Sequence, residues 1–533
     1  MSSLSFPSRR SAVLARQGMV ATSQPLAAMA GLRTLMAGGN AADAAVTTAA
    51  MLNVVEPMST GIGGDCFALI YDNKSGEVTA LNGSGRSPAA FGLAEARALG
   101  LKEIPTTGPL PVTVPGAASG WQALLDRFGT MSLAACLAPA IKTAEEGFAV
   151  SERISAAWQG SVKKLAGEEE AARVYLPAPK PGQIHRQPDL VKTFRQVAEG
   201  GAEAFYRGPL AERIARAVQA QGGYLTAEDL AGHEATWHRP IRTTYRDVEV
   251  LEHPPNGQGL AALVALNVVE GYDMAEMSYY DTQRWHVMIE AMRMGMVDAG
   301  RYVADPEMVE VPLTALLSKE YAARRRAEIQ PERAMALAAP GQPQDGGTVY
   351  LTVVDGQGNA VSFINSLYHS TFGSGLVVPG TGICLQNRGA CFVLEPGHPN
   401  ALAGGKRPYH TIIPAMALRA GRLWLSFGVM GGFMQPQGHL QVVVNMVDYG
   451  LDPQAALDAP RFRVDERGGP RVAVETGAPL KTRRELAALG HEVQPQTTFA
   501  PRFGGGQIIA VDPESGVLWG GSDPRKDGCA VGF

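Results

Sequence analysis

The sequence Gly346-Gly347-Thr348 places residues together that could carry out a self-cleavage reaction. A polar connector rich in proline and glycine ends here, and an apolar β-forming run begins with a hydroxyl residue. Glycine tolerates the strained backbone that attack on the carbonyl of Gly347 by the Thr348 hydroxyl requires. An N→O acyl shift and hydrolysis would then leave Thr348 as a new N-terminus. Its free α-amine, with a reference pKa of about 8, could serve as the base for its own hydroxyl.

Thr348 also has a purely structural interpretation, because threonine is a good β-former and often begins a strand. Other catalytic and metal motifs do not occur. His233-Glu234 is followed by His238, five positions after the first histidine, so the two rings would not share a helical face. The sequence contains no G-x-x-x-x-G-K-[ST] phosphate loop and no G-x-S-x-G elbow. The five cysteines form no C-x-x-C pair. We therefore predict neither a metal nor a cofactor.

The elements around this site are expected to be helices in the first two-thirds of the chain and strands in the last third. Apolar periodicity predicts helices at 25–57 with a break at 38–40, and at 119–128, 132–147, 189–199, 209–220, 226–231, 259–271, 279–300 and 436–449. Strands are predicted at 66–71, 78–81, 239–253, 348–354, 360–365, 507–511 and 516–519. Residues 84–116 are predicted to be a loop and 322–346 an exposed connector. This distribution predicts an α+β, layered architecture.

Composition excludes several classes of protein. The 533 residues are 45% hydrophobic, and 47 Lys+Arg stand against 51 Asp+Glu, so no basic field favours nucleic acid. No run of about 18 apolar residues predicts a membrane span, and the N-terminus shows no secretory signal. We therefore expect a soluble, cytoplasmic protein. Glycine is abundant, with 62 residues that often occur in pairs, and paired glycines mark turns or close backbone approaches.

A series of landmarks runs in order along nearly the whole chain: Ala37-Gly-Gly-Asn-Ala-Ala-Asp-Ala-Ala45, Gly61-Ile-Gly-Gly-Asp65, Val114-Pro-Gly-Ala117, Pro254-Pro-Asn-Gly257, Asp345-Gly-Gly-Thr-Val-Tyr-Leu-Thr-Val-Val-Asp355, Thr371-Phe-Gly-Ser-Gly375, Lys406-Arg-Pro408, Asp458-Ala-Pro-Arg-Phe462 and Ser522-Asp-Pro-Arg525. In this order they resemble the γ-glutamyltranspeptidase family.

The resemblance implies the four-layer αββα sandwich of N-terminal nucleophile hydrolases. It implies a proenzyme that cuts itself between Gly347 and Thr348 into a large chain, 1–347, and a small chain, 348–533. These would form one folded unit as a heterodimer, with a dimer of heterodimers as a further option. Thr348 would be the nucleophile, and Gly431 and Gly432 would match the glycines of the oxyanion hole. Ser366 falls where the family places a second threonine near the nucleophile; its alternative is a polar residue at a strand end.

Two segments depart from the family pattern. The family holds the α-carboxylate of a γ-glutamyl group with an arginine; here Asn82-Gly-Ser-Gly-Arg-Ser-Pro88 puts Ser84 in that place and Arg86 two residues away. The family holds the α-ammonium with an aspartate; here Gln386-Asn-Arg-Gly-Ala-Cys-Phe392 has Cys391 instead, with Arg388 replacing a glutamine. A cationic Arg388 would repel an ammonium group.

Three further positions complete the predicted pocket. Two serines of the family become His410 and Thr411, and a family asparagine falls at Tyr368 or His369. Together with Arg388 and Arg86, these residues suit a substrate with one or two carboxylates and no required α-amine. The alternative for Arg388 is a structural ion pair. The pattern resembles the family's divergent acylase and small-acid amidase branch.

Three functional interpretations follow. The first is a self-processing threonine amidohydrolase or acylase that acts on a small amide bearing a carboxylate, through an acyl-Thr348 intermediate. The second is an ordinary glutathione hydrolase or γ-glutamyltransferase, which Ser84 and Cys391 disfavour. The third is a non-catalytic scaffold that is never processed, against which the retained Thr348, Gly431 and Gly432 argue.

Overall fold

The computed structural model describes residues 10–338, 347–369, 371–465 and 467–533, with Gly347 and Thr348 described by their backbone. Two seven-stranded sheets face each other. The first runs β1 (Val13–Ala15), β20 (Leu518–Ser522), β19 (Gly505–Val511), β15 (Arg422–Met430), β14 (Ala415–Arg419), β9 (Val248–Glu252) and β8 (Ile241–Tyr245). The second runs β21 (Cys529–Gly532), β2 (Met19–Thr22), β10 (Gly347–Val354), β11 (Ala360–Tyr368), β3 (Asp65–Asp72), β4 (Glu77–Gly83) and β7 (Thr236–His238).

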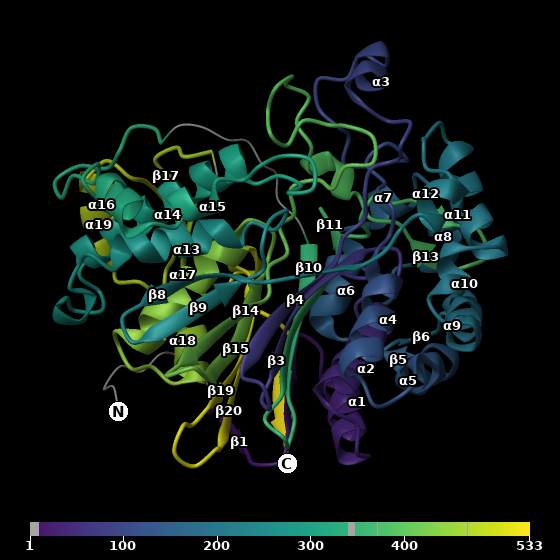
Figure 1. Cartoon of the computed structure of the whole chain (residues 1–533), viewed down its shortest axis with the longest axis horizontal. Coiled ribbons are helices and arrows are strands. Elements are labelled where there is room, and N and C mark those ends of the chain that lie inside the picture. Colours follow the sequence, from purple (N-terminus) through teal and green to yellow (C-terminus); the bar gives the residue numbers. More distant parts are fainter. Residues whose placement is uncertain (1–9, 339–346, 370, 466) are drawn as a thin grey trace.

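Helices cover the outer face of each sheet, which gives four layers (Figure 1). The first sheet packs against α13 (Gly259–Val269), α17 (Met434–Val447) and α18 (Pro453–Asp458), with α14 (Thr282–Tyr302) beyond α13. The second packs against α1 (Pro25–Met36), α2 (Ala41–Val55) and α4 (Ala117–Phe128), with α5 (Leu133–Glu146), α9 (Pro188–Gly200) and α11 (Pro209–Gln219) farther out. The predicted α+β fold with an αββα arrangement is confirmed.

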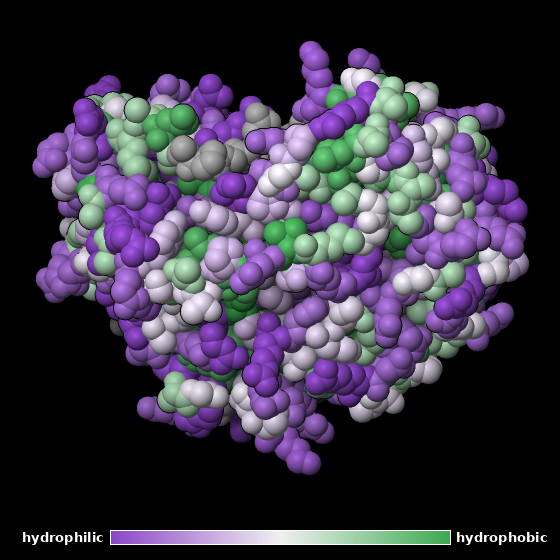
Figure 2. Space-filling model, turned by 45° about the horizontal axis from the view of Figure 1, so that its top comes forward, coloured by the Kyte–Doolittle hydropathy of each residue, from purple (hydrophilic) through white to green (hydrophobic). Residues whose placement is uncertain are grey.

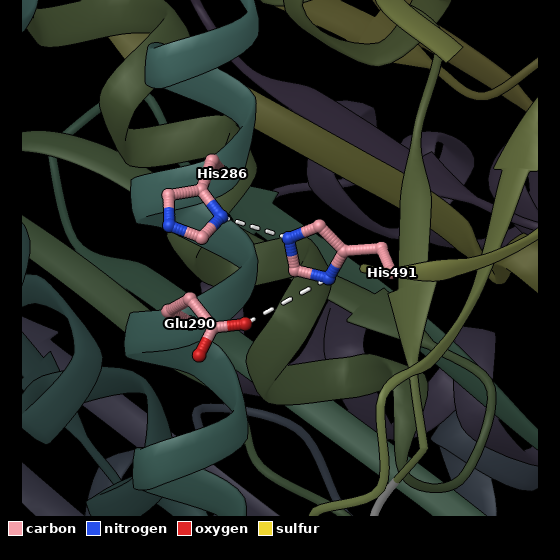
Figure 3. A group of neighbouring side chains, drawn as sticks. All are labelled: His286, Glu290 and His491. Atoms are coloured by element: carbon pink, nitrogen blue, oxygen red, sulfur yellow. Dashed lines mark hydrogen bonds and ion pairs between the residues drawn. The ribbon is translucent and has the colours of Figure 1, made fainter. Parts of the chain in front are cut away.

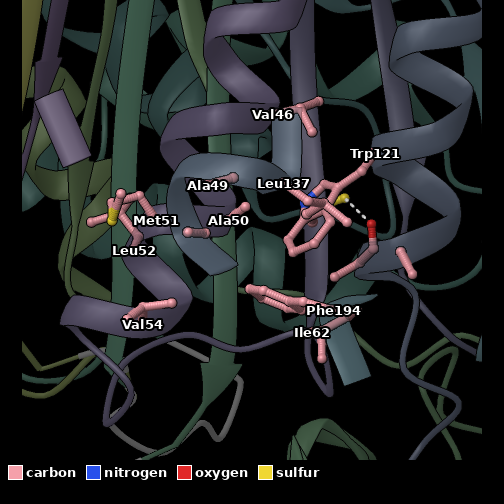
Figure 4. Close-up of a cluster of buried hydrophobic side chains, with 14 of the residues drawn as sticks. Val46, Ala49, Ala50, Met51, Leu52, Val54, Ile62, Trp121, Leu137 and Phe194 are labelled. Carbon is pink, nitrogen blue, oxygen red and sulfur yellow. Dashed lines mark hydrogen bonds between the residues drawn. The ribbon is translucent and has the colours of Figure 1, made fainter. Parts of the chain in front are cut away.

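Helix α2 shows how the alanine-rich sequence produces this packing. All of its residues are buried, and Figure 4 shows part of its contact with apolar side chains of neighbouring elements. Short alanine side chains let a helix approach a sheet and other helices closely. The helix begins where Asn40 caps it: the Asn40 side chain accepts from the backbone N–H groups of Ala42 and Asp43, and the Asp43 carboxylate accepts from Asn40 N–H.

The sequence prediction omits several elements, among them β2, β14 and α6 (Glu152–Gln159), and three further regions differ from it. The strand expected over 239–253 is two strands, β8 and β9, joined by a tight turn at Arg246, whose φ is +55°. The region 84–116 contains a short helix, α3 (Leu93–Ala98), and the expected connector starts inside helix α16 (Lys319–Arg326). The two helices have only 6 and 8 residues, too few for a hydrophobic periodicity that would predict a helix. The connector residues 339–346 lie outside the described residues.

Both sheets contain strands from either side of the Gly347–Thr348 bond. The first sheet combines β1, β8 and β9 with β14, β15, β19 and β20, and the second combines β2, β3, β4 and β7 with β10, β11 and β21. Among the described residues, no helix is both long and apolar enough to cross a membrane.

Candidate active site

The start of β10 lies at one end of the space between the two sheets. Gly347 pairs with Tyr368 at the end of β11, with a register shift before Val349. Across the sandwich, Thr352 Oγ1 lies 2.6 Å from Ser426 Oγ, and a Cβ on Gly428 would lie 2.5 Å from the Tyr350 ring. Residue 352 thus lies opposite residue 426, and residue 350 lies opposite residue 428, so the two strands run in opposite directions across the sandwich. Continued by one more step of two residues, this alignment would bring the start of β10 level with Met430 at the end of β15, directly before Gly431.

Gly431 and Gly432 form the turn between β15 and α17. Their φ angles are +128° and +60°, values that L side chains rarely adopt. Within the described part of the chain, neither backbone N–H donates a hydrogen bond. The Gly431 carbonyl accepts from Met434 N–H at 3.0 Å, which orients the peptide that carries the Gly432 N–H, and the Gly432 carbonyl accepts from Gln258 Nε2 at 2.9 Å. The turn also directly precedes the N-terminus of α17, whose dipole favours negative charge. This geometry suits the predicted oxyanion hole.

Ser366 holds the end of β11 in an unusual conformation. Its Oγ accepts a hydrogen bond of 2.9 Å from the backbone N–H of Tyr368, and its side chain is fully buried. Tyr368 has a φ of +75°, a left-handed conformation that is strained for a bulky residue. Because Tyr368 pairs with Gly347, this hydrogen bond fixes the backbone beside the start of β10.

Arg388, Tyr368 and Thr411 lie together in the structure. Arg388 Nη1 donates to Thr411 Oγ1 at 2.8 Å, and the guanidinium lies over the Tyr368 ring at 4.0 Å from its centroid. The Arg388 side chain is fully buried, and its Nε and Nη2 have no hydrogen-bond partner among the described residues. A carboxylate, Asp65, lies 4.0 Å away, but two buried donors without a hydrogen bond are costly, which makes Arg388 a candidate for binding an anion.

Asp65 is the partner of this arginine and was not identified as a site residue from the sequence. It is fully buried, and its Oδ2 lies 4.0 Å from Arg388 Nε and 3.0 Å from His410 Nε2. Its Oδ1 accepts from Gly85 N–H and from Gln386 Nε2. Burial raises the pKa of Asp65 to about 7, although the charge of Arg388 and these hydrogen bonds oppose the shift. In the sequence, only its place at the end of the Gly61–Asp65 landmark could have pointed to Asp65 as a site residue.

His410 lies behind the arginine and is fully buried. Its Nδ1 accepts from Ile412 N–H at 3.3 Å, so Nε2 carries the proton and donates to Asp65. Burial, followed by the positive charge of Arg388, lowers the pKa of His410 well below its usual value. His410 is therefore neutral and orients Asp65.

Arg86 lies outside this cluster. Its guanidinium pairs with Glu307, which also pairs with Arg407, and Arg86 is not among the residues that line the cavity described next. Ser84, in the place of the family's arginine, is buried and donates through Oγ to Asn82 Oδ1 at 2.7 Å. The geometry gives the predicted substrate-binding role of Arg86 no support.

A cavity of about 1070 Å³ opens beside these residues. Its inner wall includes Tyr368, Cys391, Tyr409 and Phe433, and Phe433 directly follows the Gly431–Gly432 turn. Cys391 connects the wall to the buried cluster, because its thiol interacts with both Tyr368 and Arg388. Its outer part is formed by α3 and the following loop, the end of α14 and residues 390–400. The cavity is large enough for a drug-sized molecule.

One further group of side chains has the composition of a metal site. His286, Glu290 and His491 are buried together (Figure 3). His286 Nδ1 lies 2.8 Å from His491 Nε2, and His286 Nε2 lies 2.9 Å from the Gln330 carbonyl. Glu290 already accepts from Arg293 at 2.6 Å. A hydrogen-bonded chain that ties α14 to residues 330 and 491 accounts for these distances.

Comparison with known proteins covers the chain from end to end. The profile of the gamma-glutamyltranspeptidase family matches residues 27–533. The chain is 38% identical over 528 residues to the glutathione hydrolase-like YwrD proenzyme of Bacillus subtilis, covering 98% of this chain and 99% of the relative. It is 36% identical over 535 residues to the oxamate amidohydrolase proenzyme of Klebsiella pneumoniae, covering 97% and 98%.

A solved structure shows that the fold is also similar along the whole chain. The crystal structure of cephalosporin acylase from Bacillus halodurans superposes with a TM-score of 0.93 at 47% identity, covering 100% of this chain and 98% of that one.

Proposed function

Because the chain belongs to the gamma-glutamyltranspeptidase family, whose members include the amide hydrolases just described, we propose that it cuts itself between Gly347 and Thr348 and uses Thr348 as its nucleophile. The chain is an amide hydrolase or acyltransferase, and its relatives are named proenzymes. The proposed products are chains 1–347 and 348–533, held together as a heterodimer.

The observation that carries this proposal is the convergence at one end of the sandwich. The alignment of β10 with β15 supports a position for residue 348 near the end of β15. There Gly431 and Gly432 offer two N–H groups without a hydrogen-bond partner in the described structure. Ser366 pins the neighbouring strand end. A nucleophile at this position would face an oxyanion site next to Phe433, which lines the cavity.

The reaction follows from this placement. The Thr348 hydroxyl attacks the amide carbon while its proton passes to the α-amine, and the carbonyl oxygen becomes an oxyanion facing Gly431 and Gly432. The C–N bond breaks, the amine leaves with the proton, and an ester to Thr348 remains. Water then attacks this ester and releases the acid. An amine in place of water would give transfer.

Arg388 supports an acyl group that bears a carboxylate. Its Nε and Nη2 are buried and have no hydrogen-bond partner among the described residues, and a carboxylate is the planar acceptor that a guanidinium binds best. Tyr368 and Cys391 lie between Arg388 and the cavity. A substrate carboxylate would therefore have to displace or pass these two side chains.

The runner-up is a glutathione hydrolase, the activity named for several relatives. Its γ-glutamyl substrate carries an α-ammonium as well as an α-carboxylate. Arg388 and Cys391 provide no carboxylate for that ammonium, and Asp65 is already surrounded by donors. Release of 4-nitroaniline from γ-glutamyl-4-nitroanilide at the rate of an ordinary family member would favour this alternative.

A denaturing gel with N-terminal sequencing tests the maturation. For the wild type we expect two bands, the smaller of which begins at Thr348. For Thr348→Ala we expect a single uncut band. For Thr348→Ser we expect the same two bands, formed more slowly. A single wild-type band would favour the unprocessed scaffold instead. A screen of processed protein against amides with and without an acyl carboxylate then tests the substrate class.

A further inference from the structure

The strands β14 and β15 separate before the chain reaches the turn that we assign to the oxyanion hole. Their last pair is Ala415 with Phe427, and β15 continues beyond it to Met430. Two residues after that pair, the backbone N–H of Val429 donates to Nε2 of His439 at 3.1 Å. His439 lies on α17, the helix that begins directly after the turn. One hydrogen bond therefore connects the strand that enters the turn to the helix that leaves it.

A second side chain of α17 takes up the opposite hydrogen bond. Ile413 is the residue that would face Val429 if the pairing of β14 with β15 continued. Its backbone N–H donates to Oε1 of Gln435 at 2.9 Å. Gln435 and His439 are four residues apart and so lie on the same face of α17. This face therefore supplies the acceptors that the two strands lose where they separate.

The contact between α17 and the end of β15 is also close. A Cβ on Gly438 would lie 2.6 Å from Cβ and Cγ1 of Val429, so the observed approach requires glycine. Gly438 directly precedes His439, and Val429 lies two residues before Gly431 in the chain. Because the helix backbone and the imidazole both contact Val429, a shift of His439 would reach the turn through Met430.

Glu252 determines which nitrogen of the His439 imidazole carries the proton. Its Oε1 lies 2.7 Å from Nδ1 of His439. Because Nε2 accepts from Val429, the proton is on Nδ1, which donates to the carboxylate. In the reversed tautomer, the N–H at Nε2 and the N–H of Val429 would point at each other. The carboxylate thus keeps Nε2 available as an acceptor.

This pair of side chains is buried and incompletely hydrogen-bonded. Hydrophilic side chains cover much of the face shown in Figure 2, where water solvates them. Glu252 and His439 are instead fully buried, and Oε2 of Glu252 has no hydrogen-bond partner among the described residues. Such a carboxylate lowers the stability of the fold, although its place against Gly259, the first residue of α13, lets the helix dipole offset part of the cost. A costly group that orients an imidazole beside the turn favours a role in the reaction.

We propose that His439 and Glu252 are positioning residues for the oxyanion hole. His439 holds the strand end that leads into Gly431 and Gly432, and Glu252 holds the proton of the imidazole on Nδ1. Neither side chain lines the cavity, so neither contacts the substrate. This inference rests on the proposed function, because it requires the turn to bind the oxyanion. Loss of the pair should therefore weaken stabilisation of the oxyanion and leave substrate binding unchanged.

Two inhibitors separate these effects when glutaryl-4-nitroanilide is the substrate of the processed protein. Glutarate resembles the acyl product and tests ground-state binding. In 4-boronobutanoate a boron atom takes the place of the acyl carbon. The Thr348 hydroxyl adds to boron while its proton passes to the α-amine, and the tetrahedral boronate anion that results places an oxygen at the oxyanion hole.

Glu252→Leu removes the acceptor for Nδ1 without leaving a buried charge. We expect kcat to fall about tenfold or more, and the inhibition constant of 4-boronobutanoate to rise by the same factor. KM and the inhibition constant of glutarate should stay unchanged, and the melting temperature should change by only a few degrees. Glu252→Gln retains a carbonyl that can accept from Nδ1 and should keep most of the activity.

His439→Gln provides a second variant, because its amide carbonyl can accept from Val429 but its side chain cannot also reach Glu252. The same proportional loss of kcat and of boronate affinity is expected, at a smaller size. His491→Leu is the control: His491 is another buried histidine, hydrogen-bonded to His286 at 2.8 Å and away from β15. It should leave kcat and inhibition by the boronate unchanged.

Two results would overturn the inference while the proposed function stands. One is wild-type kcat in Glu252→Leu and His439→Gln. The other is a loss of kcat in these variants without a matching loss of boronate affinity, which would indicate a general structural role. Failure of the processed wild type to hydrolyse glutaryl-4-nitroanilide, or any other carboxylate-bearing amide, would overturn the proposed function and this inference with it.

Discussion

The guanidinium carbon of Arg388 lies 4.0 Å from the centroid of the Tyr368 ring, and Tyr368 is also the backbone partner of Gly347. One residue therefore joins the start of β10 to a fully buried positive charge. The φ of +75° at Tyr368 places its ring under the arginine, and the hydrogen bond to Ser366 maintains that angle. Tyr368 thus contacts both the arginine that we assign to substrate binding and the strand end that we assign to the nucleophile.

Replacing Arg388 by lysine should separate charge from geometry. Lysine retains the positive charge but cannot bind a carboxylate through two parallel N–H groups or stack on Tyr368. We expect KM for amides with an acyl carboxylate to rise about tenfold or more, with a smaller change for amides without one. Arg284→Lys is the control, because Arg284 is also buried on a tyrosine ring, at 4.2 Å from Tyr279. Equal KM values for both substrate classes would contradict the role of Arg388.

Gly432→Ala should impair the chemical step. Gly432 has a φ of +60°, and an added methyl group would disturb the turn that presents the N–H groups. Loss of one oxyanion donor typically lowers kcat by about 10²–10³-fold. Gly450→Ala provides the comparison, since Gly450 has the same φ of +60° with open space around it. Both variants should lose about 1 kcal/mol of stability, and only Gly432→Ala should lose activity in single-turnover measurements.

Ser366 should act through the backbone of Tyr368. In Ser366→Ala the acceptor for the Tyr368 N–H is gone, so the strained angle is less well held. We expect kcat to fall about tenfold or more while the melting temperature changes by only a few degrees. Ser366→Thr retains the hydroxyl and should restore most of the activity. Full activity of the alanine variant would show that the hydroxyl is dispensable.

Asp65 should make stability depend on pH. Its folded-state pKa is raised to about 7 from a reference of 3.8, mainly by burial. Between these values the folded protein binds a proton that the unfolded chain has released. The free energy of unfolding therefore gains a contribution at low pH that is lost as pH rises from about 4 through about 7, of the order of a few kcal/mol at most.

Urea unfolding at pH 5, 6, 7 and 8 measures this contribution. Asp65→Asn has no carboxyl group to titrate, so its stability should fall less than that of the wild type across the window. Asp43→Asn supplies a buried control outside the site, where the carboxylate caps α2 and binds the loop at Thr130. Parallel pH curves for wild type and Asp65→Asn would argue against the raised pKa.

The family and the sandwich fold could be predicted from the sequence, and so could the turn that we assign to the oxyanion hole. The Gly431–Gly432 turn follows a long apolar strand, and the sandwich follows from landmarks that span the chain. The cluster of Asp65, Arg388 and His410 was only partly predictable, because its members meet through tertiary contacts between β3, the 3-10 turn at Arg388–Cys391 and the segment before β14. The sequence position of Arg86 predicts a place in the pocket, but its guanidinium pairs with Glu307, more than two hundred residues away in the chain.

The mixed membership of both sheets has a consequence for assembly. Each sheet joins strands from both sides of the Gly347–Thr348 bond, and β10 itself is flanked by β2 on one side and β11 on the other. Neither proposed product contains a complete sheet, so each alone would expose unpaired strand edges that invite aggregation. We therefore expect the Gly347–Thr348 bond to be needed while the chain folds and to become dispensable once both sheets have formed. We would accordingly expect 1–347 and 348–533, made as separate polypeptides, not to reconstitute the enzyme, although the same two pieces stay together after a cut in the folded precursor.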